Sequence, residues 1–175
     1  MSNEPATAAP PDRKIIIGIA ELHASANAGD VLVTYALGSC LGVTMHDPGM
    51  GVGGLAHVML PTSELNLQRA AVSPATFVDT GVTALLEACS RLGARRAQLI
   101  ITAVGGAAHS NGATRDQFQI GRRNFVALGK ALLGAGLILR AQDVGGQFSR
   151  NVSLAIGTGE VHITKFENTS LRTLS

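Results

Sequence analysis

The feature that most constrains the fold is a series of short apolar runs separated by turns that contain Gly, Asn or Pro. Runs of this length, rich in Val, Ile and Leu and bounded by such turns, indicate β-strands. They occupy residues 14–19, 31–37, 40–46, 51–60, 97–104, 137–144, 151–156 and 161–166. We therefore expect about eight strands.

Two longer segments show the apolar spacing of a helix instead. The first opens with Ser73 as N-cap and Pro74 at the first helical position, and it ends at Gly93. The second follows Gln119 and carries the apolar residues Phe125, Leu128, Leu132 and Leu133. Together the elements predict an α/β (α+β) fold of mixed β-sheets in layers, with sheet packed on sheet as well as on helices.

The 175 residues match one domain of ordinary size. We expect residues 1–13 to form a flexible tail and residues 14–175 a single domain. The start lacks the pattern of a secretory signal, and no apolar run approaches the roughly 18 residues that span a membrane, so we expect a cytoplasmic protein without membrane insertion. A formal charge of +2 and an aromatic content of 3% argue against nucleic acid as a partner.

The two cysteines have different contexts. Cys89 falls on the apolar face of the first predicted helix, which favours a buried structural thiol. Cys40 follows the turn Gly38-Ser39, and such a turn can leave the sulfur accessible and nearby backbone N–H groups free to stabilise an oxyanion.

A hairpin brings a histidine toward Cys40. The run 40–46 alternates as a half-buried strand would, and if residues 47–50 form the loop of a regular ladder, Cys40 faces His57. Directly opposed residues have Cβ atoms about 4.5–5.5 Å apart. A nearby imidazolium would favour the reactive thiolate. Thr34, on the preceding strand, is a candidate to orient the imidazole.

Structural interpretations remain open for each of these residues. A lone Cys is usually a small buried hydrophobe, and a His among apolar residues is usually a hydrogen-bonded core residue. Ladder pairing is also sensitive to register, because a one-residue slip moves side chains to the opposite face.

Other sites find little support in the spacing. His23, His46, His109 and His162 are scattered without the spacing of a metal site, so surface positions and no bound metal are expected. The glycine pairs at 105–106 and 145–146 fit no nucleotide-binding motif, and we expect no cofactor.

Beyond these spacings, the chain resembles the CheD family of chemoreceptor glutamine deamidases. The resemblance rests on the segments TYALGSC (34–40), DP (47–48) and GGLAHVMLP (53–61), and it continues through 79–80, 105–107, 120–124 and 143–146. The loop that follows residue 107 departs from the family, whose members often carry a Met-Phe pair there. We expect this change to bear on the choice of receptor or partner and not on the chemistry.

The resemblance implies a layered sandwich of mixed β-sheets with two or three helices packed on one side. It also implies a Cys-His-Thr site of Cys40, His57 and Thr34, with Gly38 and Ser39 beside the substrate or oxyanion. It implies hydrolysis of glutamine amides, and also of glutamate methyl esters, in the helical cytoplasmic region of methyl-accepting chemotaxis receptors. The expected mechanism passes through a thioester.

A second hypothesis is a non-catalytic docking module for a CheC-type phosphatase or for the receptor. A third, weaker one is a hydrolase for free amides or for other protein targets.

Overall fold

The computed structural model describes residues 13–108 and 118–167, which form three layers. The strands are β1 (Arg13–Ile16), β2 (Leu22–Ser25), β3 (Asp30–Leu37), β4 (Leu41–Asp47), β5 (Val52–Val58), β6 (Ile100–Gly105), β7 (Leu139–Val144), β8 (Phe148–Ala155) and β9 (Val161–Glu167). The α-helices are α1 (Leu67–Val72), α2 (Val78–Arg91) and α3 (Ile120–Gly134), with 3-10 turns η1 (Ser63–Leu65), η2 (Pro74–Thr76) and η3 (Arg96–Gln98).

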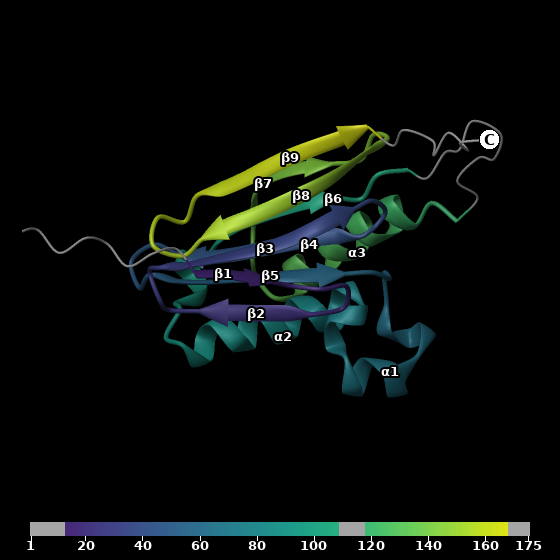
Figure 1. Ribbon diagram of the computed structural model, residues 1–175. Coiled ribbons are helices and arrows are strands. Elements are labelled where there is room, and N and C mark those ends of the chain that lie inside the picture. Colours follow the sequence, from purple (N-terminus) through teal and green to yellow (C-terminus); the bar gives the residue numbers. More distant parts are fainter. Residues whose placement is uncertain (1–12, 109–117, 168–175) are drawn as a thin grey trace, which may run out of the picture.

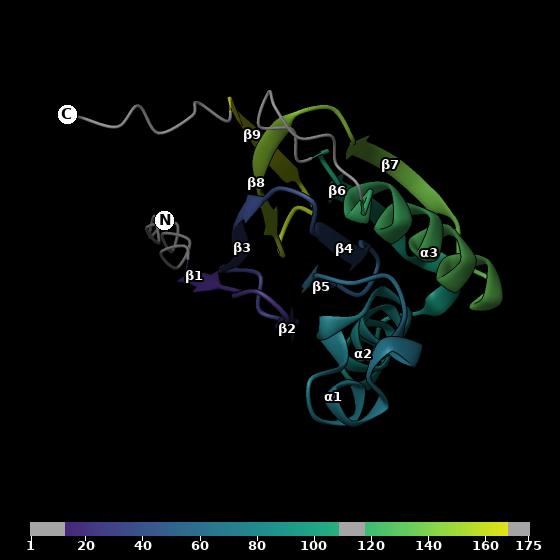
Figure 2. The same cartoon turned by 90° about the vertical axis from the view of Figure 1, so that its right-hand side faces the viewer.

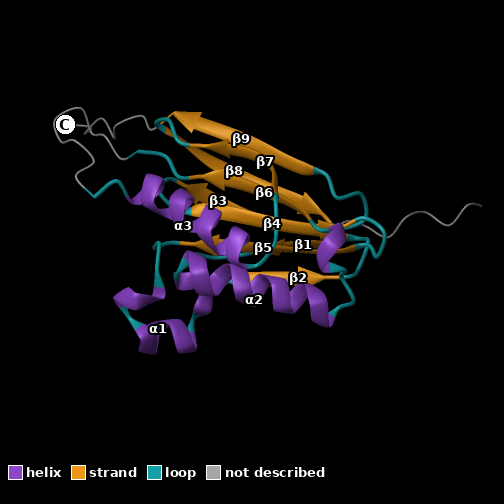
Figure 3. Ribbon diagram, turned by 180° about the vertical axis from the view of Figure 1, so that it is seen from behind, coloured by secondary structure: helices purple, strands orange, loops and turns teal. Residues whose placement is uncertain are grey.

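The strands form two mixed sheets that stack on each other (Figure 1). One sheet has four strands in the order β1-β3-β8-β9, and the other has five in the order β2-β5-β4-β6-β7. The β1–β3 and β6–β7 pairs are parallel, and the remaining pairs are antiparallel. The helices cover the outer face of the five-stranded sheet (Figures 2 and 3). The predicted sandwich of mixed sheets with helices on one side is confirmed.

Two apolar clusters fill the spaces between the layers. Leu41, Val43 and Met45 of β4 pack with α2 and α3, whereas Leu55 of β5 and Val104 of β6 face the four-stranded sheet. All residues of β4 and β5 are buried, so the prediction of a half-buried strand at 40–46 is wrong. The reason is that β4 lies in the middle layer, with apolar layers on both faces.

The β4–β5 hairpin has a different register from the predicted one. Asp47 stays in the ladder opposite Val52, so the loop comprises residues 48–51. The Asp47 carboxylate accepts from the N–H groups of Gly49 and Met50, which starts the turn one residue later than expected. The ladder consequently pairs His57 with Gly42 and ends at Leu41, and Cys40 is not directly opposite His57.

Several element boundaries also differ from the prediction. The segment expected as one helix from Ser73 begins as the turn η2 and becomes α2 only at Val78, because Phe77 is extended. Two further elements, β2 and α1, lie in segments to which we assigned no element. Arg13, the last residue of the expected tail, is the first residue of β1, and residues 1–12 lie outside the described residues.

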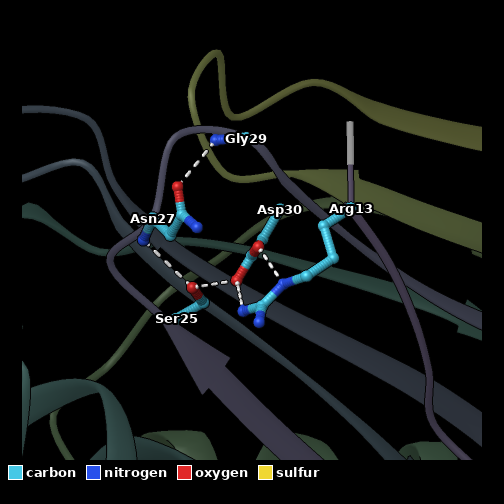
Figure 4. Close-up of polar contacts among 5 residues, drawn as sticks. All are labelled: Arg13, Ser25, Asn27, Gly29 and Asp30. Carbon is cyan, nitrogen blue, oxygen red and sulfur yellow. Dashed lines mark hydrogen bonds and ion pairs between the residues drawn. The ribbon is translucent and has the colours of Figure 1, made fainter. Parts of the chain in front are cut away.

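A buried carboxylate anchors the start of β1 and β3. Arg13 donates two hydrogen bonds of 2.8 Å to Asp30, and the Ser25 hydroxyl donates a third of 2.6 Å (Figure 4). The guanidinium of Arg13 holds the pKa of Asp30 below its usual value. In the same turn, the Asn27 side chain accepts from the Gly29 N–H, as a turn at this position requires. The anchor fixes the parallel pair β1–β3, and β3 carries Thr34 of the candidate site.

Candidate active site

The two sheets meet in a hydrogen bond between Thr34 and His57. Thr34 lies on β3 of the four-stranded sheet, and His57 lies on β5 of the five-stranded sheet. The Thr34 hydroxyl oxygen is 2.7 Å from His57 Nδ1, and both residues are buried. The structure thus brings together two of the three residues that the sequence analysis singled out, across the interior of the sandwich.

The hydrogen-bond partners assign the proton on His57. The Thr34 hydroxyl donates its only proton to the Ile17 carbonyl oxygen, 2.8 Å away. Thr34 can then only accept from His57, so Nδ1 carries the imidazole proton and Nε2 carries a lone pair. Nε2 is buried and has no hydrogen-bond partner among the described residues. Its environment lowers the pKa of His57 to about 4, because burial disfavours the charged ring.

Cys40 lies immediately before β4, on the face of the middle layer that His57 occupies. Its sequence parity matches Gly42, the ladder partner of His57, and its side chain packs against the apolar cluster between the two sheets. In a regular ladder, such diagonal neighbours have Cα atoms about 7–8 Å apart, within reach of long side chains. The side chain is half-buried, whereas that of Cys89 is fully buried.

Burial raises the pKa of Cys40, while its own backbone N–H lowers it. With the pKa of His57 shifted downward, burial favours the neutral thiol and the neutral imidazole. The imidazolium that we expected beside the sulfur is therefore disfavoured in the free protein. The site presents a thiol proton donor and a ring nitrogen acceptor.

Hydrogen bonds to three consecutive backbone carbonyls hold the turn that carries Cys40. The carbonyl of Gly38 accepts from Ala107 N at 2.7 Å, and that of Cys40 accepts from Gly106 N at 2.8 Å. The Ser39 carbonyl accepts from the side chain of Asn124 on α3.

Glycine is required at position 105, in the turn that hydrogen-bonds to the Cys40 carbonyl. At Gly105 the backbone has φ +112°, and a Cβ there would collide with the Cys40 carbonyl oxygen. No other residue type fits at this position.

Because these carbonyls accept hydrogen bonds from within the protein, the backbone N–H groups of the turn can point toward a substrate. Within the described residues, neither the Ser39 nor the Cys40 N–H donates to another residue's backbone carbonyl. Gly38 is the exception, because its N–H donates to the Ala36 carbonyl.

A β-bulge places this turn at the end of β3. The pairing of β3 with β8 shifts between Thr34 and Leu37, and Ala36 adopts a left-handed φ of 56°. The Ala36 N–H donates to the side chain of Asn151 on β8. This irregularity redirects the chain between Thr34 and Cys40, a change that strand parity cannot predict.

An ionic network that sequence reasoning missed supports the turn. Buried Arg150 donates to the Asp143 carboxylate at 3.0 Å and to the Gly145 carbonyl at 2.9 Å, and Lys165 pairs with the same carboxylate. Gly145 N in turn donates to the Gly105 carbonyl. Residues 143–146 were part of the resemblance to the CheD family, but no spacing in the sequence indicated Arg150 as their partner.

The other histidines and cysteine do not join the site. Cys89 is buried on α2 as predicted, and burial raises its pKa to about 12. His46, expected at the surface, is buried because β4 lies in the middle layer, and its ring bonds the Ile156 carbonyl between the sheets at 2.9 Å. His109 and most of the altered loop lie outside the described residues. Within residues 13–108 and 118–167, no cluster of His, Cys, Asp or Glu could hold a metal ion.

Comparisons with known proteins identify the family. A family model described as CheD chemotactic sensory transduction matches residues 59–165. The chain is 39% identical over 149 residues to the probable chemoreceptor glutamine deamidase CheD 1 of Syntrophus aciditrophicus (strain SB), covering 85% of this chain and 92% of that protein. The chain belongs to the CheD family.

Other CheD relatives are equally well covered. The probable chemoreceptor glutamine deamidase CheD of Solibacter usitatus (strain Ellin6076) is 42% identical over 148 residues, 85% of this chain and 86% of its own. The protein of that name from Pyrococcus abyssi (strain GE5 / Orsay) is 36% identical over 153 residues, covering 87% and 92%. The family-model match begins just after His57 and includes Asn124. None of the helices in the described part of this CheD chain is long and apolar enough to cross a membrane.

Proposed function

We propose that this chain is a chemoreceptor glutamine deamidase in which Cys40 is the nucleophile, His57 the acid and base, and Thr34 the residue that orients the ring. The observation that carries the proposal is the Thr34–His57 bond, which leaves an unpartnered ring nitrogen on the face that Cys40 shares. A buried imidazole with one fixed nitrogen and one free nitrogen suits proton transfer to and from a neighbouring sulfur.

The proposed reaction begins with the neutral pair. His57 Nε2 takes the thiol proton as the Cys40 sulfur attacks the carbon of the glutamine side-chain amide. The amide oxygen becomes an oxyanion, which we expect the N–H groups of Ser39 and Cys40 to bind. His57 then returns the proton to the leaving nitrogen, ammonia departs, and a thioester remains. Water, deprotonated by His57, hydrolyses the thioester to glutamate and restores the thiol.

The direct test is mass spectrometry of receptor cytoplasmic fragments after incubation with the protein. We expect selected glutamine peptides to gain the mass difference between an amide and a carboxylic acid. Cys40→Ala should abolish the change, whereas Cys89→Ala should retain it because that thiol is buried away from the site. Receptor peptides that stay unmodified with folded wild-type protein would refute the proposal.

A second candidate function is docking of an acidic partner, such as a CheC-type phosphatase. A groove of about 700 Å³ runs between α3 and the segment around η1, and its lining carries three basic residues, Arg122, Arg123 and Lys130, beside two acidic ones, Glu64 and Asp79. Exposed basic side chains around an open groove favour an acidic partner. Under this hypothesis, Arg123→Glu combined with Lys130→Glu abolishes co-purification with the partner, while Cys40→Ala leaves it intact.

A further inference from the structure

The Asn124 side chain joins the segment that carries Cys40 to the segment that carries His57. Asn124 lies in the first turns of α3 and is fully buried. Its Nδ2 donates to the Ser39 carbonyl at 2.9 Å and to the Met59 carbonyl at 2.8 Å. One amide group from the helix layer therefore holds both segments of the proposed site.

These two bonds lie where the β4–β5 ladder stops. Its last pair is Leu41 with Val58, so Ser39 and Met59 both fall beyond the paired residues. A single amide nitrogen has two N–H groups, and the two carbonyls take both. Asn124 thus supplies a cross-link at the point where the strands no longer bond each other directly.

Packing alone does not account for an amide at this position. Asn124 Oδ1 is buried and has no hydrogen-bond partner among the described residues. A buried acceptor without a partner lowers stability, and an apolar side chain of similar size would avoid that loss. The two donors of Nδ2 are what an apolar residue could not provide.

The bond to Ser39 also fixes the peptide group between Ser39 and Cys40. No cis peptide bond occurs in the described chain, and in a planar trans peptide the N–H points opposite to the carbonyl oxygen. Holding the Ser39 carbonyl against α3 therefore directs the Cys40 N–H away from the helix. That N–H is the backbone group that lowers the pKa of Cys40.

We propose that Asn124 is a positioning residue that sets the Cys40 nucleophile through the Ser39 carbonyl. The catalytic part of this role rests on the proposed function, but the orientation of the Cys40 N–H does not depend on any substrate. Without the Asn124 donors the peptide group can turn, and the Cys40 thiolate loses the stabilisation that this N–H provides.

The test measures the reaction of Cys40 with iodoacetamide as a function of pH, followed by intact-protein mass. The proteins are the wild type, Asn124→Leu and the isosteric Asn124→Asp, which replaces the two donors by acceptors. We expect both variants to move the labelling curve to higher pH, and labelling at neutral pH to slow roughly tenfold for every pH unit that the midpoint moves. With receptor fragments, kcat should fall while KM changes little.

Two controls separate positioning from loss of stability. Leu128→Ala removes a buried side chain from the same helix without removing a bond to the Cys40 turn, so its melting temperature should fall while its labelling curve stays in place. Cys40→Ala should show no labelling, which assigns the signal to Cys40 and not to Cys89.

Each outcome decides the proposal. An unchanged curve in either folded Asn124 variant overturns it, and so does an equal displacement in Leu128→Ala, because the effect would then be general loosening. If Asn124→Leu does not fold, the result for Asn124→Asp decides. A displaced curve in a protein that never deamidates receptors would support positioning while refuting the proposed function.

Discussion

The Thr34 hydroxyl makes two hydrogen bonds, so substitutions at this position can distinguish the effect of losing the hydroxyl from the effect of changing the side-chain shape. Thr34→Val keeps the branched side chain but leaves His57 Nδ1 and the Ile17 carbonyl without their partner. We expect kcat/KM to fall roughly 10–100-fold, a part of what a positioned acid–base group contributes. Unfolding in urea should show a loss of about 1–3 kcal/mol, the cost of unpaired buried groups.

Thr34→Ser is the matched control, because it retains the hydroxyl and loses only a methyl group. It should keep most of the activity. If Thr34→Ser were as inactive as Thr34→Val, the hydroxyl would not be the group that matters.

The sequence could point to single residues but not to all of their contacts. Spacing made Cys40 and His57 plausible site residues, and the resemblance to the CheD family supported Thr34 as a third. The hydrogen bond between Thr34 and His57 joins different sheets. The arrangement of strands in those sheets follows from pairing between residues far apart in the sequence, which a local pattern does not contain. Asn124 belonged to a recognisable motif, yet nothing in its spacing indicated the two carbonyls that it binds.

At the scale of elements, α3 offers two glycines with opposite roles. A Cβ at Gly121 would collide with the carbonyl oxygens of Gly106 and Ala107, whereas a Cβ at Gly129 would meet nothing within 4 Å. Gly121→Ala should therefore lower the free energy of unfolding by about 1–3 kcal/mol, because the helix must shift from the turn behind Cys40.

Gly129→Ala should raise the free energy of unfolding by roughly 0.5–1 kcal/mol, as alanine in an exposed helix does. Thermal and urea unfolding of the two variants checks the difference in sign. A stabilising Gly121→Ala would contradict the close approach of α3 to the turn.

The hairpin shows how far a local pattern determines an element. Both strands were predicted, but the loop begins one residue later because the Asp47 side chain caps it. A one-residue shift of a four-residue loop changes each pairing by two residues, which preserves the face of every side chain. Cys40 and His57 consequently share a face as predicted, although they are not directly opposed.

The short elements β2 and α1 were missed for a different reason. β2 is defined by its pairing with β5, which is distant in sequence. α1 has a local signal that could have been used, since the Asn66 side chain caps it by accepting from Arg69 N. A six-residue helix with one buried residue nevertheless carries little apolar periodicity.

For the whole molecule, buried ionisable groups make stability depend on pH in two steps. The pKa of His57 is about 4 in the folded chain and about 6.5 when unfolded, so the unfolded state binds more protons between these values. Stability should fall by roughly 2–4 kcal/mol as the pH drops from 6.5 to 4, at about 1.4 kcal/mol per pH unit. Urea unfolding at several pH values, compared with His57→Gln, measures this step, which the variant should lack.

A second step follows at lower pH. The carboxyls of Asp30 and Asp47 have pKa values below their ordinary value because Arg13 and Arg95 donate to them. Their contribution is present above pH 3.8 and is lost as the pH falls further through the folded values. Equal pH dependence in wild type and His57→Gln above pH 4 would contradict the first step and leave the second unaffected.

The bond between Thr34 and His57 crosses from one sheet to the other, and this has a consequence for the life of the protein in a cell. In a newly made chain in which only one sheet has formed, the proposed nucleophile Cys40 would lack an aligned His57. The thiol is then no better a catalyst than any other cysteine. Deamidation is irreversible, so under the proposed function an enzyme that acts only once its interior is closed would not modify glutamines before its own folding is complete.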